Sequence, residues 1–302
     1  MFTRPRPRSL MPAGALVAAF ALLAGCGSSG TGGGQPARSA QSSRSAPATT
    51  DGQAYGRFTR PLIVDNPMFP LAVGTEFSYQ GTIVQHGETK PHSVTFTVTD
   101  VIKKADGVQT VVAWDRDFLG GQLEEQELAL FAQDDQGNVW NFGEYPEEYD
   151  ESGKFTGAPS TWIRGADGAY GGVHMPAQPR DGMKYREGLV PAIEFDDVSV
   201  VTKTGQQNCV PKHCYQQVLM VDETSPNDPA SGHQLKYYAP RTGLIRVGAR
   251  GGDAQEFLTL TAVRHLGPAE LAKTRAAVLA MDQRAYRVST VYRSTRPAQP
   301  RG

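Results

Sequence analysis

The sequence has no apolar run long enough to cross a bilayer, and it has only three cysteines in 302 residues. The longest apolar stretch runs from Leu10 to Ala24, which is 15 residues, whereas a transmembrane helix needs about 20. Arg4, Arg6 and Arg8 precede this stretch and form a positive n-region. The segment therefore has the format of a secretory signal rather than of a membrane-spanning anchor.

Motifs that carry well-known chemistry are also missing. The sequence contains no H-E-x-x-H, G-x-S-x-G, P-loop or dinucleotide fingerprint. No metal-binding spacing relates its six histidines, which are His86, His92, His174, His213, His233 and His265. We therefore expect no metal and no cofactor, and a non-catalytic module rather than an enzyme. Because catalytic groups can come from distant positions in a chain, missing motifs lower the odds of an enzyme without excluding one.

A strongly basic balance is absent as well. The 30 basic side chains fall to 27 when the three arginines of the leader are removed, against 31 acidic ones, which leaves a net charge near −4. A general nucleic-acid binder needs a basic stripe. The charge balance therefore argues against a nucleic-acid partner.

The apolar run ends in Leu23-Ala24-Gly25-Cys26, which resembles the bacterial lipobox. The resemblance implies that Cys26 receives a diacylglyceryl group, that cleavage occurs between Gly25 and Cys26, and that acyl chains such as palmitate then anchor the protein. The expected location is the cell membrane, facing the extracytoplasmic side. An ordinary secreted protein with a free Cys26 is the alternative.

The sequence predicts five segments. Residues 1–25 form the lipoprotein signal peptide. Residues 26–54 form a disordered Gly/Ser-rich tether, because Gly27–Asp51 contains no large aliphatic or aromatic side chain. A β-rich domain follows over residues 55–266, then a helix over 267–290 and a disordered tail over 291–302.

The other two cysteines, Cys209 and Cys214, are separated by four residues. In an exported protein such a pair most often forms a structural disulfide, here at the tip of a hairpin. A redox pair and a metal site with His213 remain as alternatives, although the C-x-x-C spacing is missing.

The β-rich domain shows period-two alternation. In "SVTFTVTDV", Val94, Phe96 and Val98 alternate with threonines, and Asp106-Gly107 then marks a hairpin. Many short strands with close turns predict a mainly β fold, an antiparallel meander that forms a curved sheet, sandwich or half-open barrel. Pro268 and the spacing from Leu271 to Ala285 predict one C-terminal amphipathic helix.

Two groups of acidic residues are candidate sites. Glu144, Glu147, Glu148 and Asp150 could supply a carboxylate pair for glycoside cleavage, but a solvated acidic loop is favoured. Asp134, Asp135 and Asn138 could bind calcium, because Asp134-x-Gln136-x-Asn138 begins the spacing of an EF-hand loop. Gly137 comes too early, however, and Tyr145 stands where the closing glutamate belongs, so a hairpin turn is favoured.

Three phrases together resemble a family of uncharacterised exported β-rich bacterial lipoproteins. They are "NPMFPLAVGTEFSYQG" (Asn66–Gly81), "AQDDQGNVWNFGE" (Ala132–Glu144) and "KYYAPRTGLI" (Lys236–Ile245). This resemblance implies export and a β-rich fold, and it implies no reaction, cofactor or catalytic residue.

The leading hypothesis is therefore a lipid-anchored binding or scaffolding module with a cell-wall or envelope protein as partner. The alternatives are a carrier of a hydrophobic or lipid ligand and a cell-wall hydrolase. A carrier predicts a continuous apolar cavity, and a hydrolase predicts convergent titratable groups in a cleft. A scaffold predicts neither of these, but an exposed aromatic patch near Trp162. The identity of any small-molecule ligand stays open.

Overall fold

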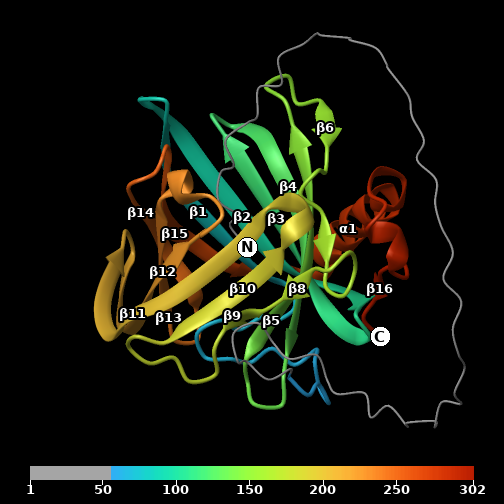
Figure 1. Cartoon of the computed structure of the whole chain (residues 1–302), viewed down its shortest axis with the longest axis horizontal. Helices are drawn as coiled ribbons and strands as arrows, with labels where there is room; N and C mark the ends of the chain where they lie inside the picture. Colours follow the sequence, from blue (N-terminus) through green and yellow to red (C-terminus); the bar gives the residue numbers. More distant parts are fainter. Residues whose placement is uncertain (1–55) are drawn as a thin grey trace, which may run out of the picture. The chain divides into compact units, whose positions relative to one another are not determined.

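The computed structural model describes residues 56–302 (Figure 1). One large antiparallel sheet contains all sixteen strands of these residues. The strands are β1 (Thr75–Gln85), β2 (Glu88–Ala105), β3 (Val108–Leu119), β4 (Gln122–Gln133), β5 (Val139–Tyr149), β6 (Phe155–Gly157), β7 (Trp162–Ile163), β8 (Tyr170–Gly171), β9 (Val173–Met175), β10 (Lys184–Val190), β11 (Phe195–Val210), β12 (His213–Thr224), β13 (His233–Ala239), β14 (Gly243–Arg250), β15 (Ala254–His265) and β16 (Gln299–Pro300).

The strand order is that of a meander in two halves. Strands β1 to β6 are neighbours in sequence order, and so are β10 to β15, while β1 pairs with β15 in the middle of the sheet. The sheet is not closed. The predicted antiparallel meander with an open, curved sheet and a single C-terminal helix is confirmed.

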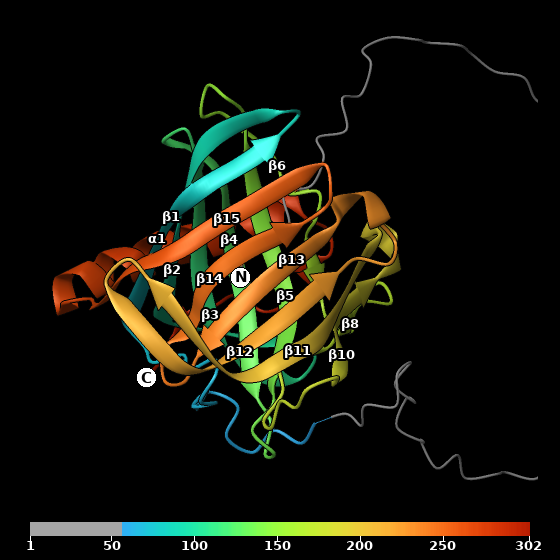
Figure 2. The same cartoon turned by 90° about the vertical axis from the view of Figure 1, so that its left-hand side faces the viewer.

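The two edges of the sheet approach each other. The segment from β8 to β9 lies between β5 and β10, where Gly172 accepts a hydrogen bond from the Asn141 backbone N–H and donates one to the Glu187 carbonyl, both at 2.9 Å. The sheet therefore curls until its two halves face each other, as Figures 1 and 2 show.

The inner face of this curl contains much of the core. On β1 and β2 it is formed by the alternate residues Phe77, Tyr79, Val94, Phe96 and Val98, all of them buried. The alternation predicted for β2 is therefore real. The intervening Thr97 and Thr99 are also buried, which a strand with one face in water would not show.

The helix α1 (Pro268–Val288) begins as the sequence predicts. Pro268 occupies the first turn, and the Glu270 carboxylate accepts a hydrogen bond from the Gly267 N–H at 3.0 Å, a favourable arrangement at a helix N-terminus. Its apolar stripe includes Val278 and Met281, which belong to the core. The helix packs on the outer side of β2 (Figure 1), which explains why that strand is buried on both faces.

The C-terminal residues correct the prediction of a disordered tail over residues 291–302. Tyr292 lies in the 3-10 helix η3 (Tyr292–Ser294), is fully buried, and donates a hydrogen bond to Asp282 at 2.7 Å. Further on, Gln299 pairs with Ile102 of β2. The tail has few apolar residues, so its sequence predicted disorder. Its ordered structure depends instead on the buried Tyr292 and on backbone pairing with β2.

No helix within residues 56–302 has the length and hydropathy needed to cross a bilayer. The predicted signal peptide and the whole of the predicted tether lie outside the described residues, so both stay predictions.

A buried ion pair connects α1 to the sheet, and its removal should be costly. Lys103 Nζ lies 2.8 Å from Asp282 Oδ1, and both side chains are almost inaccessible to solvent. Asp282→Ala leaves a buried ammonium without its counter-charge, so we expect a loss of about 3–5 kcal/mol in the free energy of unfolding, measured by urea denaturation.

The matched control is Asp100→Ala, which breaks another ion pair between α1 and β2. Its partner Arg275 is about a third exposed and can be solvated by water, so we expect a loss of at most about 1 kcal/mol. Equal losses in the two variants would contradict the assigned role of the Lys103–Asp282 pair.

Candidate functional site

The inner face of the sheet contains buried charged side chains among its apolar ones. Strand register shows how they come together, because residues paired across neighbouring strands share a face. One row crosses the sheet through Val221, Lys236, Val247, Leu258, Gly81 and His92, and a neighbouring row passes through Tyr185, Ser199, Glu223 and Gln234. The curl removes these polar groups from water.

A buried hydrogen-bonded network occupies part of this face. Lys236 Nζ donates to Glu223 Oε2 at 2.7 Å. Ser199 Oγ donates to Glu187 Oε1 at 2.6 Å, and the other oxygen of Glu187 lies 2.7 Å from Nδ1 of His174. All five residues are at most 2% exposed.

The charges in this network support one another. Burial disfavours the Lys236 ammonium, but the carboxylates of Glu223 and Glu187 outweigh that effect and raise its pKa. Burial raises the pKa of Glu187, and the Lys236 charge counteracts this rise. The network therefore keeps its ion pair in a site that would otherwise neutralise it.

His174 has one ring nitrogen without a hydrogen-bond partner among the residues that the structure describes. Burial, with a smaller contribution from Lys236, lowers its pKa to about 3, so the imidazole is neutral. Because Nδ1 faces a carboxylate oxygen of Glu187, Nδ1 carries the ring proton and Nε2 is left as an acceptor. Nε2 is buried and has no hydrogen-bond partner among residues 56–302.

A small pocket with a cavity volume of about 30 Å³ lies where His174 and Lys236 meet the aromatic part of the core. The segment before β1 and the start of β14 complete it. Its lining is formed by Phe69, Pro70, Leu71, Phe77, Tyr79, Phe96, His174, Lys236, Tyr238, Thr242, Gly243 and Leu244. The edge of the Phe69 ring packs against the imidazole, with ring centroids 4.3 Å apart.

This arrangement can bind a molecule, and it also contains an imidazole oriented by a carboxylate, although a pKa of about 3 makes that imidazole a weak base at neutral pH. Apolar walls with a few convergent polar groups are typical of small-molecule sites. The His174 imidazole, oriented by a carboxylate, has half of the geometry of a catalytic dyad. The other half is missing in the described part of the chain, where the Ser199 hydroxyl bonds to Glu187 and not to His174.

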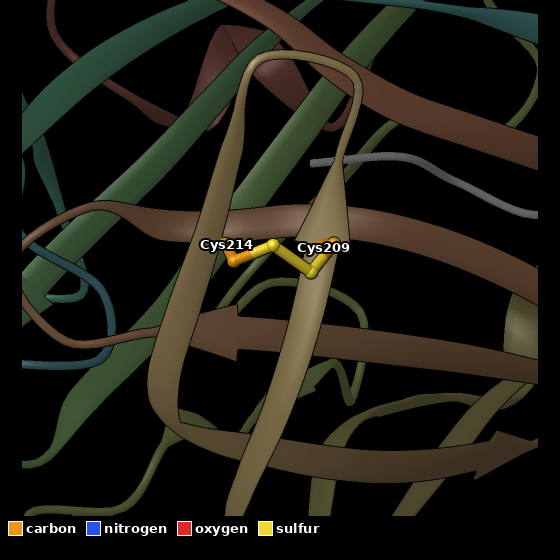
Figure 3. The surroundings of a disulfide bond; sticks show 2 residues. All are labelled: Cys209 and Cys214. Atoms are coloured by element: carbon orange, nitrogen blue, oxygen red, sulfur yellow. A yellow bond between two sulfur atoms is a disulfide. The ribbon is translucent and has the colours of Figure 1, made fainter.

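The predicted cysteine pair lies at the tip of the β11–β12 hairpin. Figure 3 shows the disulfide between Cys209 and Cys214, which face each other across the two strands. His213 packs against Tyr215 beside it, with ring centroids 4.4 Å apart. The predicted lipidation and cleavage residues, Cys26 and Gly25, lie outside the described residues.

The acidic segment from Glu144 to Asp150 is not the solvated loop that the sequence predicts. Most of it belongs to β5, and Glu144 and Glu147 are at most 1% exposed. Glu144 accepts a hydrogen bond from the Trp162 indole at 3.0 Å, whereas Glu147 binds Arg284 of α1. The two carboxylates therefore have separate structural partners. The sequence did not predict the second half of β5 as a strand. Both faces of β5 are covered, so its residues show no simple alternation of buried and exposed positions.

The predicted turn at Asp134–Asn138 is confirmed. One carboxylate oxygen of Asp134 accepts backbone N–H groups from Gln136 and Asn138 at 2.9 Å, and the other accepts the Trp140 indole N–H at 2.8 Å. The carboxylate that would bind calcium is thus occupied by the turn itself. Trp162, around which an exposed aromatic patch was expected, is buried against Phe195.

Comparison with known proteins gives no family. No protein-family model and no curated protein matches the chain. A solved structure from Bacteroides fragilis, described as an exported protein with a YmcC-like fold, is 13% identical over 65% of this chain and 98% of that chain, with a TM-score of 0.37. A structure from Parabacteroides distasonis, described as a lipoprotein, is 14% identical over the same shares, with a TM-score of 0.29. At these values neither likeness assigns a fold family or an activity to this chain.

The state of His174 predicts a pH dependence of stability. In the unfolded chain this imidazole has its ordinary pKa of 6.5, while the folded protein holds it at about 3. The unfolded state therefore binds a proton first, and stability falls as the pH falls below 6.5. We expect His174 alone to cost about 2 kcal/mol between pH 7 and pH 5, measured by urea denaturation at each pH.

In His174→Gln this contribution should vanish, while His213→Gln on the exposed hairpin should keep it. An unchanged pH slope in His174→Gln would show that His174 is not the responsible group.

Proposed function

We propose that the protein is a lipid-anchored lipoprotein of the cell envelope whose half-open sheet binds a small, mostly apolar molecule with one hydrogen-bond donor. The signal-like leader and the lipobox at Cys26 support the anchor. The disulfide between Cys209 and Cys214 fits an oxidising compartment outside the cytoplasm.

The observation that carries the binding proposal is the unpartnered Nε2 of His174 in a residue that lines the pocket. A buried acceptor without a partner costs free energy, and a ligand that donates a hydrogen bond recovers it. The aromatic walls, among them Phe69, Phe77 and Phe96, favour a flat apolar body around that donor. A neutral imidazole also selects a donor rather than a carboxylate.

The other two functions have weaker support. A carrier of long acyl chains needs a continuous apolar cavity, whereas the charged residues Lys236, Glu223 and Glu256 are buried on the inner face. A hydrolase is favoured by the His174–Glu187 pair, but no hydroxyl or thiol of residues 56–302 bonds to His174 in the hydrogen-bond network described above.

Matched probes test the binding proposal. Phenol and anisole have similar apolar bodies, but only phenol has a hydrogen-bond donor. We expect phenol to bind the purified protein at least five-fold more tightly than anisole in a ligand-observed NMR titration, since a hydrogen bond to a neutral group contributes about 1 kcal/mol. Benzoate should bind more weakly than phenol. Native mass spectrometry of protein from its own membranes would then identify the natural ligand.

Two variants locate the binding. Thr242→Trp fills the lining and should abolish phenol binding, while Thr82→Trp, on the outer side of β1, should leave it unchanged. His174→Leu should remove the preference for phenol over anisole. Equal affinities for the two probes in the unaltered protein would refute the donor requirement, and binding retained in Thr242→Trp would refute the pocket.

The anchor is tested separately. Cys26→Ser removes the sulfur that the acyl group requires, so we expect the protein to lose labelling by radioactive palmitate and to leave the membrane fraction. The double variant Cys209→Ser/Cys214→Ser is the matched control, because it removes two thiols and should keep the label. A labelled Cys26→Ser protein would contradict the proposed anchor.

A further inference from the structure

A second group of polar side chains lies on the inner face, away from the pocket. His92 of β2, Asp117 of β3 and Glu256 of β15 each place one nitrogen or oxygen atom within 4.8 Å of the others. No residue of this group lines the pocket. The cluster therefore needs its own explanation.

A glycine on β1 allows His92 and Glu256 to approach each other. Strand β1 separates β2 from β15, so His92 and Glu256 must reach each other across it. The β1 residue paired with His92 is Gly81, which has no side chain to fill that space. A Cβ atom at Gly81 would lie 1.7 Å from the Phe257 carbonyl oxygen, so the neighbouring strand excludes any larger residue here.

The histidine has one occupied and one unoccupied nitrogen. Nε2 is hydrogen-bonded to the Asp117 carboxylate. Nδ1 lies 3.3 Å from Oε1 of Glu256, but it has no hydrogen-bond partner with acceptable geometry. The His92 side chain is 4% exposed and that of Glu256 is 3% exposed, whereas the Asp117 side chain is 26% exposed, so water borders the cluster on the Asp117 side.

The surrounding bonds orient both groups as metal ligands require. Asp117 accepts from Nε2, which leaves the lone pair on Nδ1, and such a carboxylate–histidine pair is the usual support of a metal-bound imidazole. Gln234 Nε2 donates to Oε2 of Glu256 at 2.6 Å and turns Oε1 toward His92. Two ligands bound to zinc at about 2.0–2.1 Å in tetrahedral geometry lie roughly 3.4 Å apart, close to the 3.3 Å observed here.

We propose that His92 and Glu256 bind a divalent transition-metal ion such as Zn²⁺ through Nδ1 and Oε1, with Asp117 as the residue that positions His92. An imidazole with a carboxylate suits borderline ions such as Zn²⁺ and Co²⁺. Ca²⁺ takes six to eight oxygen ligands, which this pair cannot supply. The remaining coordination positions belong to water.

A salt bridge is the competing explanation for the same geometry. Burial lowers the pKa of His92, but Asp117, Glu256 and Glu124 together outweigh it and raise the pKa to about 9, which would place a protonated imidazole between carboxylates. A salt bridge needs no metal, so the two explanations differ in what a metal titration shows.

The test is a titration of untagged, chelator-treated protein with ZnCl2 at pH 7.5, followed by isothermal calorimetry. We expect one Zn²⁺ per chain, and no comparable heat with CaCl2. His92→Gln and Glu256→Gln should each weaken binding at least 100-fold, and Asp117→Asn should weaken it 10- to 100-fold because it disturbs only the orientation of His92. His213→Gln, which removes an exposed imidazole, should leave the affinity unchanged.

Two further measurements make the result decisive. Co²⁺ should give visible absorption bands that Glu256→Gln lacks, and Zn²⁺ should raise the melting temperature of the unaltered protein but not of Glu256→Gln. This nearly isosteric variant decides the matter if His92→Gln does not fold. The proposal is overturned if neither Zn²⁺ nor Co²⁺ binds, if both glutamine variants bind as the unaltered protein does, or if Ca²⁺ is preferred. In the first two of these outcomes the cluster is a salt bridge only.

Discussion

The curl of the sheet is the constraint on which the other features depend. An open sheet could leave its polar residues in water, but here Gly172 joins β5 to β10, and the two halves of the sheet cover much of the inner face. Any charged side chain on that face must then find a partner within the protein. The Lys236–Glu223 ion pair and the hydrogen bonds of Glu187 are the result.

The outer face of β2 to β5 is subject to the same constraint, because α1 and the C-terminal residues cover it. Lys103 pairs with Asp282, and Glu147 of β5 pairs with Arg284 of α1. The helix is therefore held by buried charges as well as by its apolar stripe. The 3-10 helix η3 belongs to this layer as well, because Tyr292 packs against Tyr145 with ring centroids 5.1 Å apart.

Two histidines of the inner face illustrate how surroundings decide the chemistry of one residue type. Each has one nitrogen at a carboxylate and one without a hydrogen-bond partner in the described part of the chain. The free nitrogen of His174 belongs to a ring packed against Phe69, which suits an organic molecule. The free nitrogen of His92 faces the oxygen of Glu256, which suits a cation.

Local patterns in the sequence determined most of the longer strands, the C-terminal helix and the cysteine pair, because each depends on residues close together in the chain. The strand β10 and the short strands β6 to β9 were not predicted. The alternation of Val94, Phe96 and Val98 and the turn at Asp134 are examples of patterns that did predict structure. The same alternation could have shown that Glu223 shares a face with Val221, and Lys236 with Tyr238. Only the tertiary structure decided that these residues meet His174 and Glu187, or that His92 meets Glu256, because the curl and the register join strands that are distant in sequence. The sequence also could not predict the ordered C-terminal residues or the burial of Glu144. Both depend on contacts with distant parts of the chain: β2 and α1 for the C-terminal residues, and Trp162 for Glu144.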